Sequence, residues 1–263
     1  NYARKRAGIY VWNYRSLIIN PENADCVSIC GNYVSEATSS APTGFYNGGG
    51  GIYVAEGGEA LLQTTSTAAH IKIGYNYCNT GNGSAVYCEK NGIFRTYINT
   101  NLHNNGTEIF YNENADSNGG APGIYLADEA KFDGQGLKIY DNYFSNSANN
   151  SKKIGVAIHC ENKVIGWSSS TFKYMILSNT NNLVDLFLPS KYTTDSNYAN
   201  VITQSGTTIT LKGGLINDSS SKCLSTLTLG FKVSDSVYKK ASFEKDSSLS
   251  SGNINITSRC SSW

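Results

Sequence analysis

The chain has 263 residues, of which 40% are hydrophobic and 16% are charged, so it can bury one large core or two smaller ones. Its 21 Lys and Arg nearly balance 20 Asp and Glu, and the formal net charge of +1 excludes an electrostatic footprint for nucleic acid or anionic lipid. No run of about 18 apolar residues is present. We therefore expect neither a nucleic-acid partner nor a transmembrane segment in this chain.

The composition is typical of strands and corners. Gly (26 residues), Asn and Ser are common in turns, Tyr (18 residues) favours strands, and helix formers are scarce. Seven cysteines fit an oxidising compartment, and their odd number leaves at least one thiol free or paired with another chain. The chain begins with Asn rather than Met, which favours a processed chain or a piece of a longer one. We expect an all-β protein that is extracellular or at the cell surface.

A repeat runs from residue 8 to residue 179. Its first segment has the pattern small, aliphatic, aromatic, apolar, and occurs at residues 8–11, 51–54, 85–88, 123–126 and 157–160. Its last segment reads Ile-x-x-Asn and occurs at residues 29–32, 73–76, 109–112, 139–142 and 176–179. A short apolar stretch lies between them, at residues 17–19, 60–62, 93–94, 131–132 and 164–165. Each repeat therefore carries three strand candidates.

Three short strands per repeat predict a right-handed parallel β-helix, a three-sided solenoid with about five regular coils. The repeats assign residues 1–186 to this solenoid. Residues 187–263 are rich in Ser and lack both motifs, although strand patterns remain at 201–203, 207–211 and 224–233. We interpret this part as a β-structured C-terminal extension or cap.

The third position of each first segment is aromatic. Because side chains alternate along a strand, the second and fourth positions are expected to point inward and the third to point outward. The outward row contains Tyr10, Tyr53, Tyr87, Tyr125 and His159. Stacked rings stabilise a sheet, and a flat aromatic strip is also a platform for sugar rings or a partner protein. These five residues are the predicted binding residues.

The Asn of Ile-x-x-Asn closes the last strand of each repeat, where it can adopt a left-handed conformation and bond to neighbouring backbone. Identical Asn residues on successive coils are expected to form a ladder of side-chain amides. The predicted ladder contains Asn32, Asn76, Asn112, Asn142 and Asn179. The alternative is a row of amides that binds a ligand.

Polar loops of variable length follow these asparagines, at residues 33–50, 77–84, 113–122 and 143–155. Insertions stacked on one edge of a solenoid commonly build a binding surface. Glycosylation acceptors of the Asn-x-Ser/Thr type, which carry glycans only if the source secretes through an endoplasmic reticulum, occur at Asn82, Asn105, Asn149, Asn217 and Asn255. We expect the loops to contact partners.

The alternation of a Gly-Gly-x-aliphatic segment with an x-x-Asn segment resembles the repeats of chlamydial polymorphic outer-membrane proteins and autotransporter adhesins, which read Gly-Gly-Ala-Ile and Phe-x-x-Asn. The nearest match is residues 50–53 with residues 73–76. Other copies lack the Gly pair, and Ile replaces Phe. The resemblance covers roughly residues 7–182 and implies a surface-exposed passenger that adheres to host cells.

Polysaccharide lyases and glycoside hydrolases also use the β-helix, so an enzyme is the main alternative. Hydrolysis needs two carboxylates across the scissile bond, and lyases of this fold use clustered carboxylates to hold calcium. The densest acids, with Lys131 nearby, are Asp128, Glu129, Asp133 and Asp141. An acid recurs after four of the first segments, which indicates a solvated corner, at Glu56, Glu89, Asp128 and Glu161. We assign no catalytic residue, metal site or cofactor.

Cys88 and Cys160 occupy inward positions and are expected in the core. Three disulfide pairings are close enough in sequence to consider, namely Cys26–Cys30, Cys78–Cys88 and Cys223–Cys260.

The sequence thus predicts a non-catalytic extracellular adhesin or structural protein, with a surface protein or glycan of a host or neighbouring cell as its partner. A second alternative is a self-assembling filament or surface-layer subunit whose copies stack end to end, because the first coil has no evident cap.

Overall fold

The computed structural model of the chain describes residues 2–3, 8–22, 25–35, 48–66, 68–79, 81–98, 106–115, 121–145, 155–161, 176–178, 184–188, 202–205, 208–211, 226–234, 237–244, 254–255 and 260–262. All regular elements in these ranges are β-strands. Within the same ranges there is no helix with the length and apolar character needed to cross a membrane.

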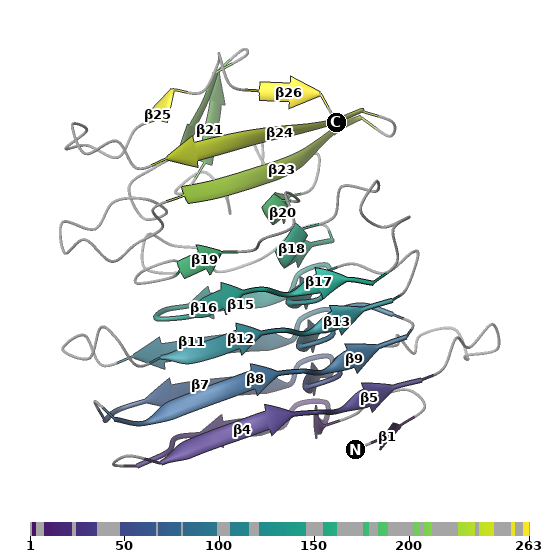
Figure 1. The fold of residues 1–263 in the computed structure, drawn as a ribbon, viewed down its shortest axis with the longest axis vertical. Coiled ribbons are helices and arrows are strands. Elements are labelled where there is room, and N and C mark those ends of the chain that lie inside the picture. Colours follow the sequence, from purple (N-terminus) through teal and green to yellow (C-terminus); the bar gives the residue numbers. More distant parts are fainter. Residues whose placement is uncertain are drawn as a thin grey trace.

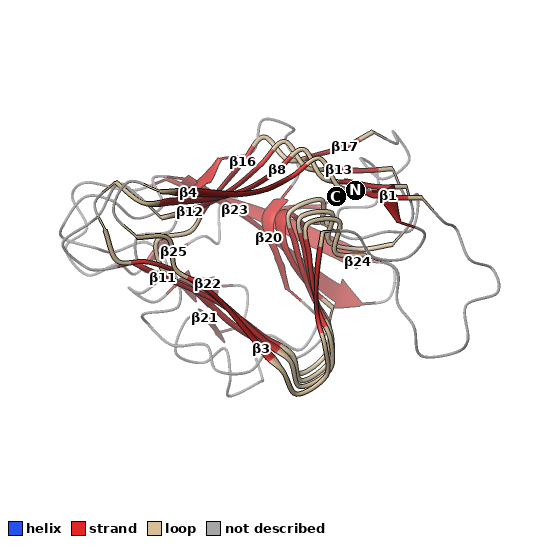
Figure 2. Ribbon diagram, turned by 90° about the horizontal axis from the view of Figure 1, so that it is seen from below, coloured by secondary structure: helices blue, strands red, loops and turns tan. Residues whose placement is uncertain are grey.

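The strands stack into a right-handed parallel β-helix (Figure 1), as the repeats predict. Three stacks surround the core when the molecule is viewed along its axis (Figure 2). We call them sheets B, C and D, in the order in which each coil passes through them, and a smaller sheet that follows sheet D is sheet A. Neighbouring coils pair in parallel and mostly in strict register, so residues at equivalent repeat positions lie side by side.

Sheet B consists, in spatial order, of β2 (Ile9–Val11), β6 (Ile52–Val54), β10 (Val86–Cys88), β14 (Ile124–Leu126), β18 (Gly155–Cys160), β20 (Val184–Leu188), β23 (Thr226–Ser234), β24 (Val237–Glu244) and β26 (Cys260–Ser262). Sheet C consists of β3 (Ser16–Ile19), β7 (Glu59–Thr64), β11 (Ile93–Ile98) and β15 (Lys131–Gly134). Sheet D consists of β4 (Cys26–Cys30), β8 (His70–Gly74), β12 (Thr107–Phe110), β16 (Lys138–Tyr140) and β19 (Ile176–Ser178).

Sheet A is an element that the sequence reasoning missed. It consists of β1 (Tyr2–Ala3), β5 (Tyr33–Val34), β9 (Tyr77–Cys78), β13 (Glu113–Asn114) and β17 (Tyr143–Phe144). Each of β5, β9, β13 and β17 starts one residue after a predicted ladder asparagine, so the predicted polar loops begin as paired strands. Two residues are too few to show the alternation by which a strand is recognised in a sequence.

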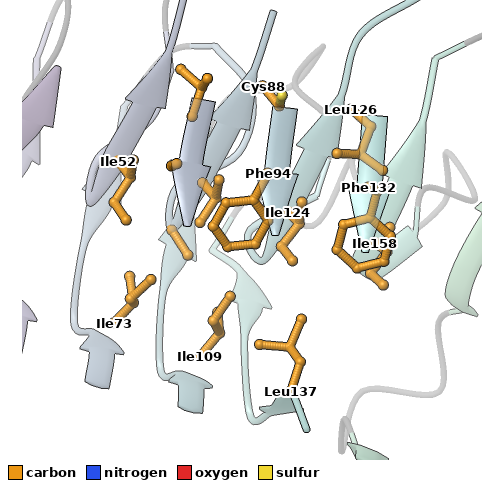
Figure 3. Packing of buried hydrophobic residues seen from close by; sticks show 14 of the residues in the cluster. Ile52, Ile73, Cys88, Phe94, Ile109, Ile124, Leu126, Phe132, Leu137 and Ile158 are labelled. Atoms are coloured by element: carbon orange, nitrogen blue, oxygen red, sulfur yellow. The ribbon is translucent and has the colours of Figure 1, made fainter. Parts of the chain in front are cut away.

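The hydrophobic core lies inside sheets B, C and D. Phe94 and Phe132 of sheet C stack with ring centroids 6.3 Å apart, among isoleucines from the two other sheets (Figure 3). Cys88 and Cys160 belong to this core, in agreement with their predicted inward positions. Burying a large apolar side chain contributes about 1.5–3 kcal/mol, so the alternating pattern of each strand fixes which face turns inward.

A four-residue turn joins sheet B to sheet C in each of the first four coils. The N–H of its last residue donates to the C=O of its first, as from Arg15 to Trp12 at 3.1 Å and from Gly92 to Glu89 at 2.8 Å. The third residue has a positive φ in every copy, and these residues are Tyr14, Gly57, Asn91 and Glu129. Gly and Asn are typical of this conformation, whereas Tyr and Glu are not.

The C-terminal part changes from parallel to antiparallel pairing. β20 and β23 extend sheet B in parallel, then β24 pairs antiparallel with β23 and β26 with β24. A separate antiparallel sheet contains β21 (Ile202–Ser205), β22 (Thr208–Leu211) and β25 (Ile254–Asn255). The strands expected near 201–203, 207–211 and 224–233 are therefore present. Residue 186, the predicted end of the solenoid, lies within β20.

Candidate functional site

The predicted ladder asparagines of the first four coils are buried side by side and linked by hydrogen bonds. The Nδ2 of each donates to the Oδ1 of the next, from Asn32 to Asn76 at 2.8 Å, from Asn76 to Asn112 at 2.9 Å and from Asn112 to Asn142 at 2.8 Å. The same Oδ1 atoms accept the backbone N–H of the preceding Asn at 3.0–3.2 Å. Asn179, the fifth predicted member, lies outside the described residues.

The Nδ2 groups of three ladder asparagines also donate hydrogen bonds to the backbone. The Nδ2 atoms of Asn76, Asn112 and Asn142 donate at 3.0–3.1 Å to the carbonyl of the Ile that begins the Ile-x-x-Asn motif of the preceding coil. Because amide and backbone groups satisfy one another inside the protein, these side chains are committed to structure rather than presented to a ligand.

The predicted outward aromatic row forms, but its three central rings are buried, while Tyr10 and His159 are half-buried. Adjacent ring centroids are 4.8–5.4 Å apart along the row Tyr10, Tyr53, Tyr87, Tyr125 and His159. Tyr53 is 0% exposed, Tyr87 is 1% exposed and Tyr125 is 7% exposed. The row does point away from the main core, as alternation requires, and packs in a second cluster with Ala55 and Ala127. These three buried rings therefore offer no surface strip for sugar rings or a partner, whereas the binding role of the half-buried Tyr10 and His159 stays a prediction.

The chain that enters sheet B covers these rings. A Cβ on Gly48 would lie 3.1 Å from Cδ2 of Tyr87, and a Cβ on Gly49 would lie 2.8 Å from Cα of Tyr53. Gly48 also pairs with Asn82 of the next coil, so the entering segments are tied together over the row. Glycines at these positions allow the backbone to approach the rings closely, which sequence alternation alone does not reveal.

His159 makes the unfolding free energy of the protein depend on pH. Burial lowers the pKa of His159 to about 3, below its usual 6.5, so the unfolded chain binds a proton that the folded chain does not. The stability that this neutral ring contributes is complete above pH 6.5 and is lost as the pH falls toward 3, by up to about 1.4 kcal/mol per pH unit. We expect His159→Phe to flatten the decline of unfolding free energy between pH 6.5 and pH 4, as measured by urea titration. An unchanged slope would contradict the burial of this ring.

A different aromatic cluster is open to solvent, at the corner between sheets D and A. We call Tyr75, Phe110, Tyr111 and Tyr140 the corner patch. Tyr75 and Tyr111 stack at 5.5 Å, and Phe110 and Tyr140 stack at 5.4 Å. The two stacks meet edge to face, with Tyr75 and Phe110 5.5 Å apart at an interplanar angle of 83°. Tyr75 is 60% exposed and Tyr111 is 43% exposed.

Gly74 supports the corner patch. It pairs with Phe110 across β8 and β12, and a Cβ on Gly74 would lie 2.8 Å from Cζ of that ring. The absent side chain therefore leaves room for Phe110 to lie back over β8, beside Tyr75. Gly74 and Phe110 occupy the same repeat position in neighbouring coils. The small Gly in one coil lets the Phe110 ring of the next coil pack beside Tyr75.

Backbone conformation at the corner patch is unusual. The residue before each of the four described ladder asparagines has a positive φ, which is 67° at Gly31, 56° at Tyr75, 49° at Tyr111 and 51° at Asp141. Gly adopts this region freely, whereas other L-residues pay about 1–2 kcal/mol. Tyr75 and Tyr111 are exposed at this position, so burial of their side chains offsets little of this conformational cost. Strain of this kind is found preferentially at functional sites.

Charged groups surround the rings. Lys138 lies 3.5 Å from Glu108, and Glu108 accepts a hydrogen bond of 3.2 Å from the Tyr140 hydroxyl. Burial and the Glu108 charge raise the pKa of Tyr140 to about 12. The charge of Asp141 raises the pKa of Tyr111. Both phenols are therefore neutral donors at physiological pH, next to carboxylates that accept hydrogen bonds.

Sheet A also carries tyrosines, which are half-buried. Tyr33 and Tyr77 stack at 4.6 Å, and the Tyr143 hydroxyl donates to Glu113 at 2.8 Å. A sequence signal for this row exists, because Tyr directly follows the ladder Asn in three coils, at residues 33, 77 and 143. These tyrosines fall within the segments predicted as polar loops.

The acids considered for catalysis are distributed over separate elements. Asp128 and Glu129 lie in the turn between β14 and β15, Asp133 lies on β15, and Asp141 follows β16 at another corner. Burial raises the pKa of Asp133, while Gln135 and Arg95 oppose the shift. Among the described residues, no group of three or more His, Cys, Asp or Glu is placed to hold a metal ion.

The pairing of Cys26 with Cys30, one of those the sequence leaves open, does not form. The two residues are the ends of strand β4, about 13 Å apart at 3.3 Å per residue, and a disulfide needs Cα atoms within about 7 Å. Cys78 and Cys88 are thiols in different clusters of sheets A and B, so the structure does not form that pair either. Cys223 lies outside the described residues, which leaves the pairing of Cys223 with Cys260 a prediction.

Two of the five glycosylation acceptors lie in described segments. Asn82 is half-buried before β10, and its carbonyl accepts the N–H of Gly49 at 3.2 Å. Asn255 is in β25. The others, Asn105, Asn149 and Asn217, lie outside the described residues.

Fold and surface together define a β-helical repeat protein with a solvent-exposed aromatic corner. Comparisons of the chain with protein-family models, with curated proteins and with solved structures found no match.

Proposed function

We propose that this protein is a non-catalytic β-helical adhesin or structural protein, extracellular or at the cell surface, that binds a glycan of a host or neighbouring cell through the corner patch. The observation that carries the proposal is the pair Tyr75 and Tyr111, which are exposed, stacked and held in a costly backbone conformation. The resemblance of the repeats to autotransporter passengers supports the same role.

The chemistry of the corner patch favours a sugar. Aromatic faces pack against the C–H faces of sugar rings, while nearby phenols and carboxylates exchange hydrogen bonds with sugar hydroxyls. Glu108 and Lys138 already form an ion pair beside Tyr140, so the polar groups are held in place before binding. Sheet A carries a second stacked pair of tyrosines, Tyr33 and Tyr77, on neighbouring coils. A glycan built from repeating sugar units matches a surface that repeats from coil to coil.

We expect the double variant Tyr75→Ala, Tyr111→Ala to bind glycan about tenfold or more weakly, since central aromatic residues dominate such interfaces. The measurement is binding to an array of immobilised neutral and acidic oligosaccharides, followed by titration of the best ligand. Tyr97→Ala is the matched control, because Tyr97 is 45% exposed on sheet C, away from the corner.

Both variants are expected to retain the far-ultraviolet spectrum of the wild-type protein. Equal glycan affinity of the double variant and the wild type would overturn the proposal. Binding of the wild type to cell-surface protein after complete removal of glycans would replace the sugar by a protein partner.

A further inference from the structure

We propose that Tyr33 and Tyr77 form a site of covalent modification, at which a haem peroxidase with hydrogen peroxide joins the two rings by a dityrosine bond within one chain. The two residues are direct register partners in the parallel strands β5 and β9, which lie side by side on neighbouring coils (Figure 1). Their ring centroids are 4.6 Å apart with an interplanar angle of 13°, the shortest separation among the described tyrosine pairs. The glycan-binding proposal does not depend on this inference.

Both rings lie on the outer face of sheet A. The residues that follow them, Val34 and Cys78, are fully buried together, and side chains alternate between the two faces of a strand. Tyr33 and Tyr77 are half-buried, so solvent and a dissolved oxidant reach them. Tyr53 and Tyr87 also stack, with centroids 5.0 Å apart, but both are buried. Close stacking and exposure therefore coincide at the pair on sheet A.

The hydroxyl groups of the pair lie close together. Burial raises the pKa of Tyr77, and the charges of Tyr33 and Glu113 and a hydrogen bond with the Tyr33 side chain raise it further. Tyr77 is therefore a neutral phenol at physiological pH. In dityrosine the new bond joins ring carbons adjacent to the two hydroxyl-bearing carbons, so the hydroxyls of the product are neighbours. Rings whose hydroxyls already meet have the relative orientation that the product needs.

The reaction removes one electron and one proton from each phenol and leaves two tyrosyl radicals. Glu113, the register partner of Tyr77 on the next coil, supplies a carboxylate that accepts the Tyr77 proton. The radicals join by a C–C bond between one Cε atom of each ring, and the hydrogen on each of these carbons moves to the oxygen of its own ring. One hydrogen peroxide molecule takes up the two electrons and two protons and becomes two water molecules.

The fold makes this coupling selective and gives it a structural effect. Parallel pairing holds the two rings together, so each radical meets its partner within the same molecule rather than by diffusion. The bond closes the chain between residues 33 and 77, which restricts the unfolded state as a disulfide does. The linked protein is therefore more resistant to unfolding.

The test uses the purified 263-residue protein at low concentration, with the exposed thiols of Cys26 and Cys30 first alkylated because thiols reduce tyrosyl radicals. The protein is treated with a haem peroxidase and hydrogen peroxide, and the monomer is isolated, digested and analysed by mass spectrometry. We expect a peptide pair joined through Tyr33 and Tyr77 that has lost two hydrogen atoms. The linked monomer should unfold at a higher urea concentration than the untreated protein.

The variants Tyr33→Phe and Tyr77→Phe keep the stacked rings but lack one hydroxyl, and each is expected to lose the link and the shift in urea concentration. Tyr143→Phe is the matched control on sheet A and should retain both, because Glu113 separates Tyr143 from Tyr77 in the register. Far-ultraviolet spectra check that the variants fold.

Absence of the Tyr33–Tyr77 link in the folded wild type would overturn the proposal. Equal yields of that link from the folded and the urea-unfolded chain would overturn it as well, since the fold would then contribute nothing to the pairing. Glycan binding measured on untreated wild-type protein remains a separate readout.

Discussion

Replacing Asn112 by Ala is expected to lower the unfolding free energy by about 3–5 kcal/mol, because it removes the centre of the asparagine ladder. Its Nδ2 donates to Ile73, Phe110 and Asn142 at 2.8–3.1 Å, and its Oδ1 accepts from both the backbone and side chain of Asn76. Alanine leaves several buried donors and acceptors without partners, which costs more than the lost bonds alone contribute. Urea titration followed by circular dichroism measures the change.

Asn32 supplies the control at the end of the ladder. It donates to Asn76 from its backbone and side chain, on one side of the ladder only. We expect Asn32→Ala to cost about 1–2 kcal/mol, clearly less than Asn112→Ala. Equal losses would mean that the ladder does not act as a connected network, and a loss below about 1 kcal/mol at Asn112 would contradict the ladder itself.

Replacing Tyr87 by Ala is expected to cost about 3–5 kcal/mol of unfolding free energy, the range for truncating a buried aromatic side chain. Tyr87 is 1% exposed and stacks on Tyr53 at 5.0 Å and on Tyr125 at 5.4 Å. Tyr97→Ala in the same coil is the matched control, with an expected change within about 0.5 kcal/mol because that side chain is exposed. Similar effects of the two variants would place the Tyr87 ring at the surface.

The fold was predictable because the same pair of motifs occurs five times in the sequence. Two inward apolar positions per strand, such as Ile124 and Leu126, fix the register, and the Ile-x-x-Asn motif fixes a corner. The ladder was predictable for the same reason, since identical residues at one repeat position must stack. Sheet A was missed because its strands have two residues each.

The surface was harder to predict than the fold. Alternation shows that Tyr53 and Tyr87 turn away from the core, but it does not show that the entering glycine segment covers them. The corner patch was missed because neither of its two repeat positions is aromatic in every coil: Gly74 precedes Tyr75, and Asp141 follows Tyr140. Phe110 reaches Tyr75 because Gly74 has no side chain. This contact joins residues of two coils, so the sequence of a single repeat does not reveal it.

The measurement that tests the central claim most directly is hydroxyl-radical footprinting of the native protein, read for each tyrosine by mass spectrometry, with and without bound oligosaccharide. We predict that Tyr75 and Tyr111 are oxidised readily and become protected by the ligand, whereas Tyr53 and Tyr87 are protected in both states. Ready oxidation of Tyr53 and Tyr87, with protection of those rings by the ligand, would contradict it and return the binding surface to the aromatic row of sheet B.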